Sequence, residues 1–371
     1  MINFSDRLKK LKERRQGTAQ RYALDQGYTA LSAAYDYRPQ ESYEKVKDSD
    51  AIKYVIGAMA PVSSKSTQVS IDEGERVANT LVSMLETDRI NTEFRLQGSV
   101  ALDIHIEGHS DVDMLILKRD VVLVQQPALP STNYTDTSDK RPMLDKVKEI
   151  RLASEVRLTS RYYQATVDCS NKKSISISGG SLARKVDIVP SCWYDTYDYQ
   201  RSGQQHDRGV RIYDKGKHAF IENKPFLHIK KVDDKDFIYG GSLKKVVRLM
   251  KNIVADMPDY KKKVAKNLTS FDLTSIAYHM DAQLTCPDYF PLLLLHRLDL
   301  WLQKLKDDKT LRDSLKSPDE VQSIFNNVEK DDALEILSKE VSDLAASVYR
   351  DLYPYDREKD INKLVYKSIY I

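Results

Sequence analysis

Three aspartates occupy positions where a globular protein rarely places charge, within or beside apolar strands. Asp111 and Asp113 open the apolar run DVDMLILK, and Asp187 lies inside the run KVDIVPSCW. Side chains alternate between the two faces of a strand, so Asp111 and Asp113 point to the same side, roughly 7 Å apart. Without a partner such carboxylates repel one another, and burial raises their pKa values. A divalent cation removes the conflict, because Mg²⁺ binds carboxylate and phosphate oxygens.

Asp187, on a strand next to the first two acids, would complete a site for metal ions. Three acids can hold two Mg²⁺ ions about 4 Å apart, one activating an attacking hydroxyl and the other stabilising a leaving pyrophosphate. We therefore predict that Asp111, Asp113 and Asp187 are catalytic residues and metal ligands, with Mn²⁺ able to replace Mg²⁺. Taken singly, a D-x-D sequence is more often a surface feature, and only the ordered set favours a site.

Further residues have the chemistry to bind the phosphates of a nucleotide. Gly98 lets the backbone approach a phosphate closely, and Ser99 adds a hydroxyl and a backbone N–H group. Downstream, VVRLMK places Arg248 and Lys251 three residues apart, on one face of a helix, where they could hold β- and γ-phosphates. Ser270, at the start of the next helix, is predicted to add another phosphate contact.

Periodicity in the chain predicts strands in the middle and helices towards the C-terminus. Strand patterns occur in TEFRLQG, DVDMLILK, SISIS and ARKVDIVPSCW, and a hairpin with Lys215 and Gly216 in its turn is predicted in GVRIYDKGKHAFIE. Residues 125–142 are polar and punctuated by proline, which indicates a surface loop. From residue 240 onward the patterns are helical.

The composition excludes several classes of protein. Hydrophobic residues make up 41% of the 371 residues, and 58 basic against 55 acidic residues leave a net charge of +3, so any site for a polyanion must be local. The three cysteines lack metal-ligand spacing and fit a reducing cytoplasm. The longest apolar run, Tyr289 to Leu295, is too short to span a bilayer, so we expect a cytoplasmic protein without membrane insertion.

The ordered set resembles the DNA polymerase β-type nucleotidyltransferase superfamily, whose pattern is GS, then D-x-D, then a third acid in an apolar strand. GGSLKKVVRLMKNI resembles a helix of the second-messenger branch (CD-NTases), which includes 2′,5′-oligoadenylate synthases, cyclic GMP-AMP synthase and bacterial cyclic-oligonucleotide synthases. The resemblance implies triphosphate-binding roles for Arg248 and Lys251 and a nucleotide contact near Ser270.

The resemblance also implies an α+β fold: a polymerase β-like catalytic lobe with a mixed sheet, a C-terminal helical lobe, and an active site in the cleft between them. We expect an N-terminal helical extension over residues 1–60, the catalytic lobe over 61–240 and the helical lobe over 241–371. The expected activity joins nucleoside triphosphates, without a template, into a short cyclic or linear oligonucleotide second messenger in antiviral defence. An effector protein that recognises the product and an activating ligand are further expected partners.

Other interpretations remain open from the sequence. The chain could nucleotidylate a protein or tRNA, or prime synthesis on a tyrosine such as Tyr366 or Tyr370. It could also be a silent, nucleic-acid-binding member of the fold, although an intact acid triad argues against that. His105 and His109 are spaced four apart, but no third ligand with suitable spacing accompanies them. Asp103 and Glu107 are interpreted as solvated loop residues rather than as metal ligands.

Overall fold

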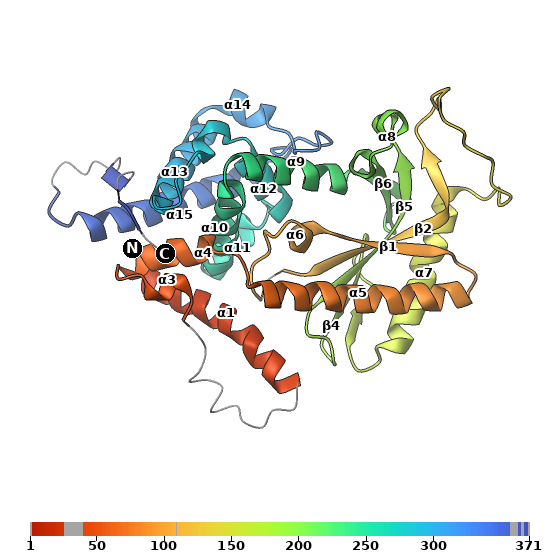
Figure 1. Ribbon diagram of the computed structural model, residues 1–371, viewed down its shortest axis with the longest axis horizontal. Helices are drawn as coiled ribbons and strands as arrows, with labels where there is room; N and C mark the ends of the chain where they lie inside the picture. The colour runs from red at the N-terminus through yellow and green to blue at the C-terminus, as the bar shows by residue number, and fades with distance from the viewer. Residues whose placement is uncertain (1, 26–39, 109, 357–362, 365–366, 370–371) are drawn as a thin grey trace. The chain divides into compact units, whose positions relative to one another are not determined.

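The computed structural model describes residues 2–25, 40–108, 110–356, 363–364 and 367–369 (Figure 1). The chain forms two compact units. The sheet unit comprises residues 63–103 and 110–231, and the helical unit comprises residues 1–62, 104–109 and 232–371. This grouping differs from the expected division at residues 60 and 240, because the N-terminal helices pack with the C-terminal ones.

The sheet unit is built on a seven-stranded mixed sheet in the order β1-β2-β5-β4-β3, with β6 pairing with β5 and β7 with β6. Its strands are β1 (Thr92–Gln97), β2 (Val112–Val124), β3 (Thr166–Asp168), β4 (Ile175–Ser178), β5 (Val186–Asp195), β6 (Gly209–Asp214) and β7 (Ala219–Asn223). β2 and β5 are parallel, and the other pairs are antiparallel. The predicted strands and the hairpin around Lys215 and Gly216 are confirmed, since Asp214 pairs with Ala219 across that turn.

Two long helices cover one face of the sheet. The helices of this unit are α5 (Ser64–Thr87), α6 (Gly98–Ala101), α7 (Met143–Arg161), α8 (Tyr197–Ser202) and the 3-10 turn η1 (Gln205–Asp207), while α9 (Pro225–Ile238) crosses the border between the units. Figure 1 shows α5 running alongside β1 and β2. The core between helices and sheet includes the following buried side chains: Val77, Leu81, Val112, Met114, Ile150, Val186 and Ile188.

The central strands carry apolar side chains on both faces. Leu115, Leu117 and Val189 pack on the face opposite α5 and α7, with Val210 of β6. A parallel pair buried on both faces is expected to form near-continuous apolar runs, which is why DVDMLILK and VDIV look alike in sequence. Charges at the start of these strands are therefore exceptional within the unit.

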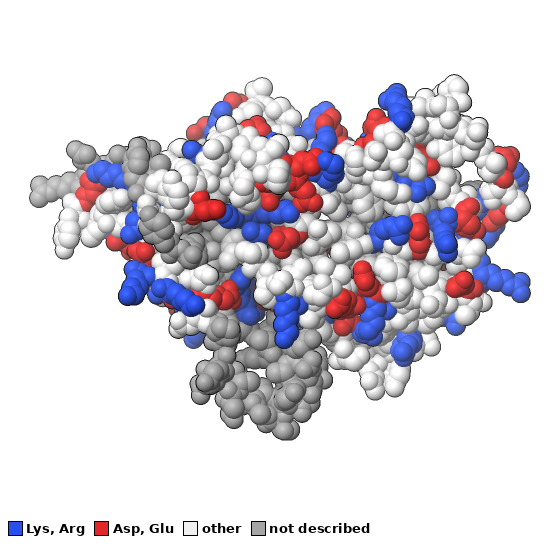
Figure 2. Space-filling model, in the orientation of Figure 1, with Lys and Arg blue, Asp and Glu red and all other residues white. Residues whose placement is uncertain are grey.

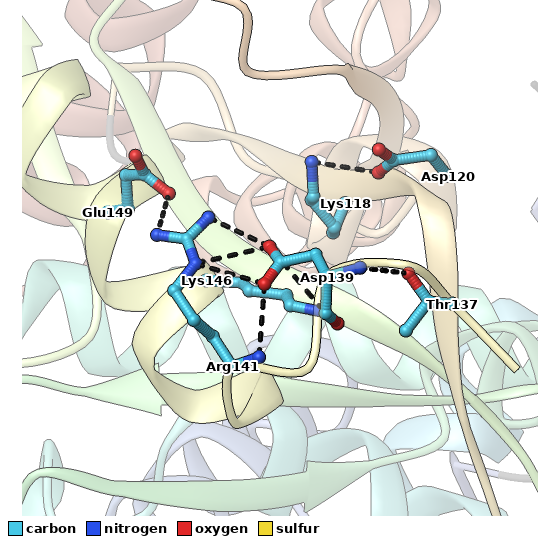
Figure 3. Close-up of polar contacts among 7 residues, drawn as sticks. All are labelled: Lys118, Asp120, Thr137, Asp139, Arg141, Lys146 and Glu149. Atoms are coloured by element: carbon cyan, nitrogen blue, oxygen red, sulfur yellow. Dashed lines mark hydrogen bonds and ion pairs between the residues drawn. The ribbon is translucent and has the colours of Figure 1, made fainter.

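Residues 125–142 join β2 to α7 and are fixed at their C-terminal end by charged side chains, as Figure 3 shows. The Arg141 guanidinium donates to the Asp139 carboxylate, with Nη2 to Oδ2 at 2.9 Å, and to Glu149 of α7 at 3.1 Å. Lys146, which is 2% exposed, donates to the Asp139 main-chain carbonyl at 2.8 Å. The predicted surface loop is confirmed, and its end is held against the first turns of α7.

The helical unit is formed by segments distant in the sequence. Its helices are α1 (Phe4–Asp25), α3 (Ser42–Lys45), α4 (Asp50–Met59), α10 (Ser242–Asp256), α11 (Asp259–Ala265), α12 (Ser270–Tyr278), the 3-10 turn η2 (Asp281–Leu284), α13 (Pro291–Asp307), α14 (Lys309–Ser314) and α15 (Val328–Leu352). The buried carboxylate of Asp256 on α10 accepts hydrogen bonds from Arg14 of α1 and from Tyr54 of α4, the latter at 2.9 Å. Both N-terminal helices are thus tied to α10.

Basic and acidic residues are nearly equal in number, and we expect both signs to occur together on the surface. On the face shown in Figure 2, basic and acidic side chains lie next to one another. Within the part of the chain that the structure describes, no helix is both long and apolar enough to cross a bilayer.

Candidate active site

Parallel pairing of β2 and β5 places two of the predicted acids side by side. Asp113 and Asp187 are register partners, so their Cα atoms lie opposite one another on adjacent strands. Leu115 and Val189, the next residues on this face, are also partners. Asp111 lies two residues before Asp113, one position before β2 begins, so alternation places it on the same side. The predicted adjacency of the strands is confirmed, and the sheet gathers the three acids at one end of its central pair.

The Gly98–Ser99 pair lies directly beside these acids. Gln97, the last residue of β1, is the register partner of Asp113, and α6 begins at Gly98. Gly98 has a φ of +79°, a left-handed conformation, and a Cβ added to it would lie 2.3 Å from Oδ2 of Asp113. No other residue type fits here without displacing that carboxylate. Ser99 follows in the first turn of α6 and is half-buried.

Burial and neighbouring charges act on Asp187 in opposite directions. Burial raises the pKa of Asp187, the Lys185 ammonium and a hydrogen bond from Ser176 lower it, and the Asp111 charge raises it again, with a net increase over the ordinary value. Ser176 is the register partner of Asp187 on β4. Oδ1 of Asp187 is buried and, among the described residues, accepts no hydrogen bond. A cation at this oxygen would satisfy it.

Lys185 already brings one positive charge to the acids. Its Nζ lies 2.5 Å from Oδ2 of Asp111 and 3.7 Å from Oδ1 of Asp187. Burial lowers the pKa of Lys185, but the hydrogen bond to Asp111 and the Asp187 charge raise it above its ordinary value, so the lysine stays charged at neutral pH. Sequence reasoning missed this residue, although Lys185 directly precedes β5, two residues before Asp187, so that alternation places both on one face.

The donor set fits a hard divalent cation. Carboxylate oxygens are the ligands that Mg²⁺ and Mn²⁺ prefer, and the buried Oδ1 of Asp187 lacks a hydrogen-bonding partner among the described residues. As the side chains stand, no group of three or more His, Cys, Asp or Glu residues in the described ranges is arranged to hold a metal ion. The role of the three acids as metal ligands stays a prediction.

Arg248 and Lys251 belong to the helical unit, on α10. Both are buried, and Nε of Arg248 donates to the main-chain carbonyl of Met59, at the end of α4, over 2.8 Å. Asn252, which directly follows Lys251 on α10, donates to the carbonyl of Ala58. The stem of Arg248 is thus held in place by the C-terminal end of α4. The role of both cations at a triphosphate stays a prediction.

Ser270 is the first residue of α12, as predicted, and it is exposed. The cap of this helix is Thr269, whose hydroxyl accepts from the Asp272 backbone in a capping box. The nucleotide contact predicted for Ser270 is not tested by this geometry. His109, like Tyr366 and Tyr370, lies outside the described residues. The three cysteines are free thiols.

Known proteins resemble this chain along nearly its whole length. The cGAS/DncV-like nucleotidyltransferase C-terminal helical domain matches residues 230–345. A cyclic dinucleotide synthase CdnE from Yersinia aleksiciae is 36% identical over 363 residues, which cover 94% of this chain and 93% of that protein. A c-di-GMP synthase from Capnocytophaga granulosa is 31% identical and covers 84% of this chain and 90% of its own length.

Solved structures agree with the α+β fold. The STING-associated CdnE c-di-GMP synthase from Capnocytophaga granulosa has a TM-score of 0.69 at 27% identity, covering 94% of this chain and 99% of that one. A STING-associated CdnE c-di-GMP synthase from Flavobacteriaceae sp. has a TM-score of 0.72 at 25% identity, with the same coverage. The predicted fold class and the second-messenger branch are confirmed. This chain belongs to the cGAS/DncV-like nucleotidyltransferases and is a nucleotidyltransferase.

Proposed function

We propose that the protein joins two nucleoside triphosphates into a cyclic dinucleotide, with cyclic di-GMP as the first product to test. In each of two steps, a ribose hydroxyl oxygen attacks the α-phosphorus of a bound triphosphate. One O–P bond forms, the bond to the β-phosphate bridging oxygen breaks, and pyrophosphate leaves. The second step closes the ring, so two pyrophosphates are released for each product.

One observation carries this proposal: Asp113 and Asp187 face each other across a parallel strand pair, with Gly98 packed against Asp113. Because Gly98 has no side chain, nothing of its own covers the backbone N–H groups at the start of α6, and a phosphate could approach them closely. The names of the relatives support a cyclic dinucleotide product, and three of them are named c-di-GMP synthases.

Each side chain in the proposal has a task set by its position. Asp111 and Asp113 would hold divalent metal, and Asp187 would share it and promote removal of the attacking hydroxyl's proton. Ser99 would bind phosphate oxygens beside them. Arg248 and Lys251 would bind the triphosphate, with Arg248 oriented through its bond to the Met59 carbonyl.

Members of this family generally use divalent metal ions. We propose two Mg²⁺ ions, replaceable by Mn²⁺. When bound, they would lower the pKa of the attacking hydroxyl and neutralise charge on the leaving pyrophosphate. The protein's own contribution is to position the reacting groups and to exclude competing contacts. In well-aligned reactions this lowers the activation barrier by about 7–11 kcal/mol.

The product would act as a signal in antiviral defence. Two of the solved relatives are described as STING-associated, and by that association we propose an effector protein that recognises the cyclic dinucleotide. An activating ligand and a cytoplasmic location are part of the same proposal.

The test is product analysis. Purified protein is incubated with GTP, ATP, CTP and UTP, singly and mixed, with Mg²⁺ or Mn²⁺, and the products are identified by mass spectrometry and nuclease digestion. A cyclic dinucleotide supports the proposal. Label that appears only on protein, on a tyrosine, or on added tRNA would support the alternative transferase, and absence of any turnover would favour a silent member of the fold.

The matched control is the double variant Asp111→Ala with Asp113→Ala. We expect turnover to disappear while circular dichroism and thermal unfolding stay near those of the parent, because both residues are partly exposed. Product formation by this variant would contradict the assignment of the acids.

A further inference from the structure

Lys185 brings a positive charge to the acids from within the chain. Its position follows from the strand pairing: Val112 is the register partner of Val186, so the residues just before them, Asp111 and Lys185, enter the sheet together. The backbone N–H of Val112 donates to the Lys185 carbonyl at 3.0 Å, which fixes this entry. The lysine is therefore placed beside the acids by the backbone and not by its flexible stem alone.

The ammonium group lies between two acids that would otherwise repel one another. It forms an ion pair with Asp111 at 2.5 Å and lies 3.7 Å from the buried oxygen of Asp187. The second separation is longer than a hydrogen bond, so Asp187 Oδ1 gains charge compensation without a hydrogen bond. Asp113, the register partner of Asp187, adds a third carboxylate beside this pair.

This contact competes with metal binding. The ammonium holds Oδ2 of Asp111, which a divalent ion at these acids could otherwise use as a ligand, and a second cation so close would be repelled. The side chain of Lys185 is 42% exposed, and its four-carbon stem lets the head group move into solvent. The Lys185 ammonium group can therefore leave the acids for solvent without a steric obstacle.

We propose that Lys185 is an internal counter-cation that keeps the acids together before loading and is displaced by the divalent metal. This inference rests on the proposed function, since it assumes that the three acids bind metal. It assigns to Lys185 a positioning role: the lysine weakens binding of metal alone, and so favours loading of metal together with its anionic nucleotide, which adds ligands and offsets the repulsion.

The test measures metal affinity without nucleotide, independently of turnover. Binding of Mn²⁺ is followed by the electron paramagnetic resonance signal of the free ion, with unfolding temperature as a second readout. Lys185→Met removes the competing charge, and we expect Mn²⁺ to bind about two- to fivefold more tightly, within the range for a partly exposed ion pair. The metal-free variant should unfold at a lower temperature, and Mn²⁺ should raise that temperature more than in the parent.

Two variants serve as controls. Lys185→Arg keeps the charge and should bind Mn²⁺ as the parent does. Lys148→Met changes an exposed lysine of α7, the helix on the opposite face of the sheet, and should leave the affinity unchanged. A Lys185→Met protein that binds Mn²⁺ no more tightly than the parent would overturn the proposal.

Asp113→Ala separates this proposal from the function on which it rests. If Asp113→Ala weakens Mn²⁺ binding while Lys185→Met leaves it unchanged, the metal site stands and the role of Lys185 is wrong. If Asp113→Ala leaves Mn²⁺ binding unchanged, the acids do not bind metal and both proposals are overturned.

Discussion

Gly98→Ala probes the packing of the α6 backbone against the carboxylate of Asp113. The added Cβ would lie 2.3 Å from Oδ2, 3.2 Å from Cγ and 3.4 Å from Cβ of Asp113. Left-handed backbone costs about 1–2 kcal/mol for a residue with a Cβ. Moving the carboxylate about 30° off its rotamer adds about 0.5–1.5 kcal/mol. We expect the free energy of unfolding of the sheet unit to fall by the sum of these costs, about 1.5–3.5 kcal/mol.

A double-mutant cycle isolates the carboxylate contact. In Asp113→Ala the two closest contacts vanish and only the Cβ contact at 3.4 Å remains, which is ordinary packing. Gly98→Ala should then cost only the backbone strain, so the coupling between the two sites should be about 0.5–1.5 kcal/mol. Gly203→Ala is the matched control, because Gly203 has a φ of +64° with nothing within 4 Å of an added Cβ.

The assay follows urea unfolding through the fluorescence of Trp193, which lies in the sheet unit. The chain has two tryptophans, so all variants carry Trp301→Phe, which leaves only the sheet-unit reporter. Turnover of Gly98→Ala should fall about 10²-fold, the effect of displacing a reacting group by about 1 Å. Equal costs of Gly98→Ala with and without the Asp113 side chain would refute the reasoning.

Two further predictions concern charged groups outside the acid cluster. Hydrogen bonds from the Arg141 side chain and backbone lower the pKa of Asp139 to about 2. In Arg141→Gln the side-chain bonds are lost, so an NMR titration should show the pKa of Asp139 rising towards its ordinary value of 3.8. An unchanged titration midpoint would contradict this. Asp256→Ala leaves Arg14 and Tyr54 without their buried partner and should lower the unfolding free energy by about 3–5 kcal/mol, whereas Tyr54→Phe should cost about 1 kcal/mol. Both costs are measured in a urea titration that follows Trp301 of the helical unit in a Trp193→Phe background. Equal costs for the two variants would show that the carboxylate is not the centre of this network.

The strands and the acids could be predicted from sequence because their signals are local. An acid inside an apolar run is visible without a structure, and the runs around Asp113 and Asp187 are apolar on both faces, as buried parallel strands require. The common face of Asp111 and Asp113 follows from alternation alone. The pairing of Asp113 with Asp187 in the strand register does not follow from alternation, because a shift of register by one residue would have placed the two acids on opposite faces.

The partners of these residues could not be predicted because they come from distant segments. Ser176 reaches Asp187 only through the antiparallel register of β4 with β5. The carbonyl of Met59 that holds Arg248 lies 189 positions away in the chain. The same reason explains why the sequence predicts residues 1–60 to be an N-terminal extension. The charges of α1 suggest a solvated surface, but Arg7 and Arg14 pair with acids buried in the helical unit.

Two features of the acid cluster lower the stability of the sheet unit, and both arise from carboxylates placed close to other groups. Gly98 adopts a left-handed backbone against a carboxylate, and Asp187 is buried with an oxygen that accepts no hydrogen bond among the described residues. Because its pKa is raised in the folded state, Asp187 makes folding less favourable as the pH rises from 3.8 through that raised pKa. A bound cation reverses this sign, since it favours the charged carboxylate. A metal ion bound as proposed should therefore stabilise the sheet unit by mass action.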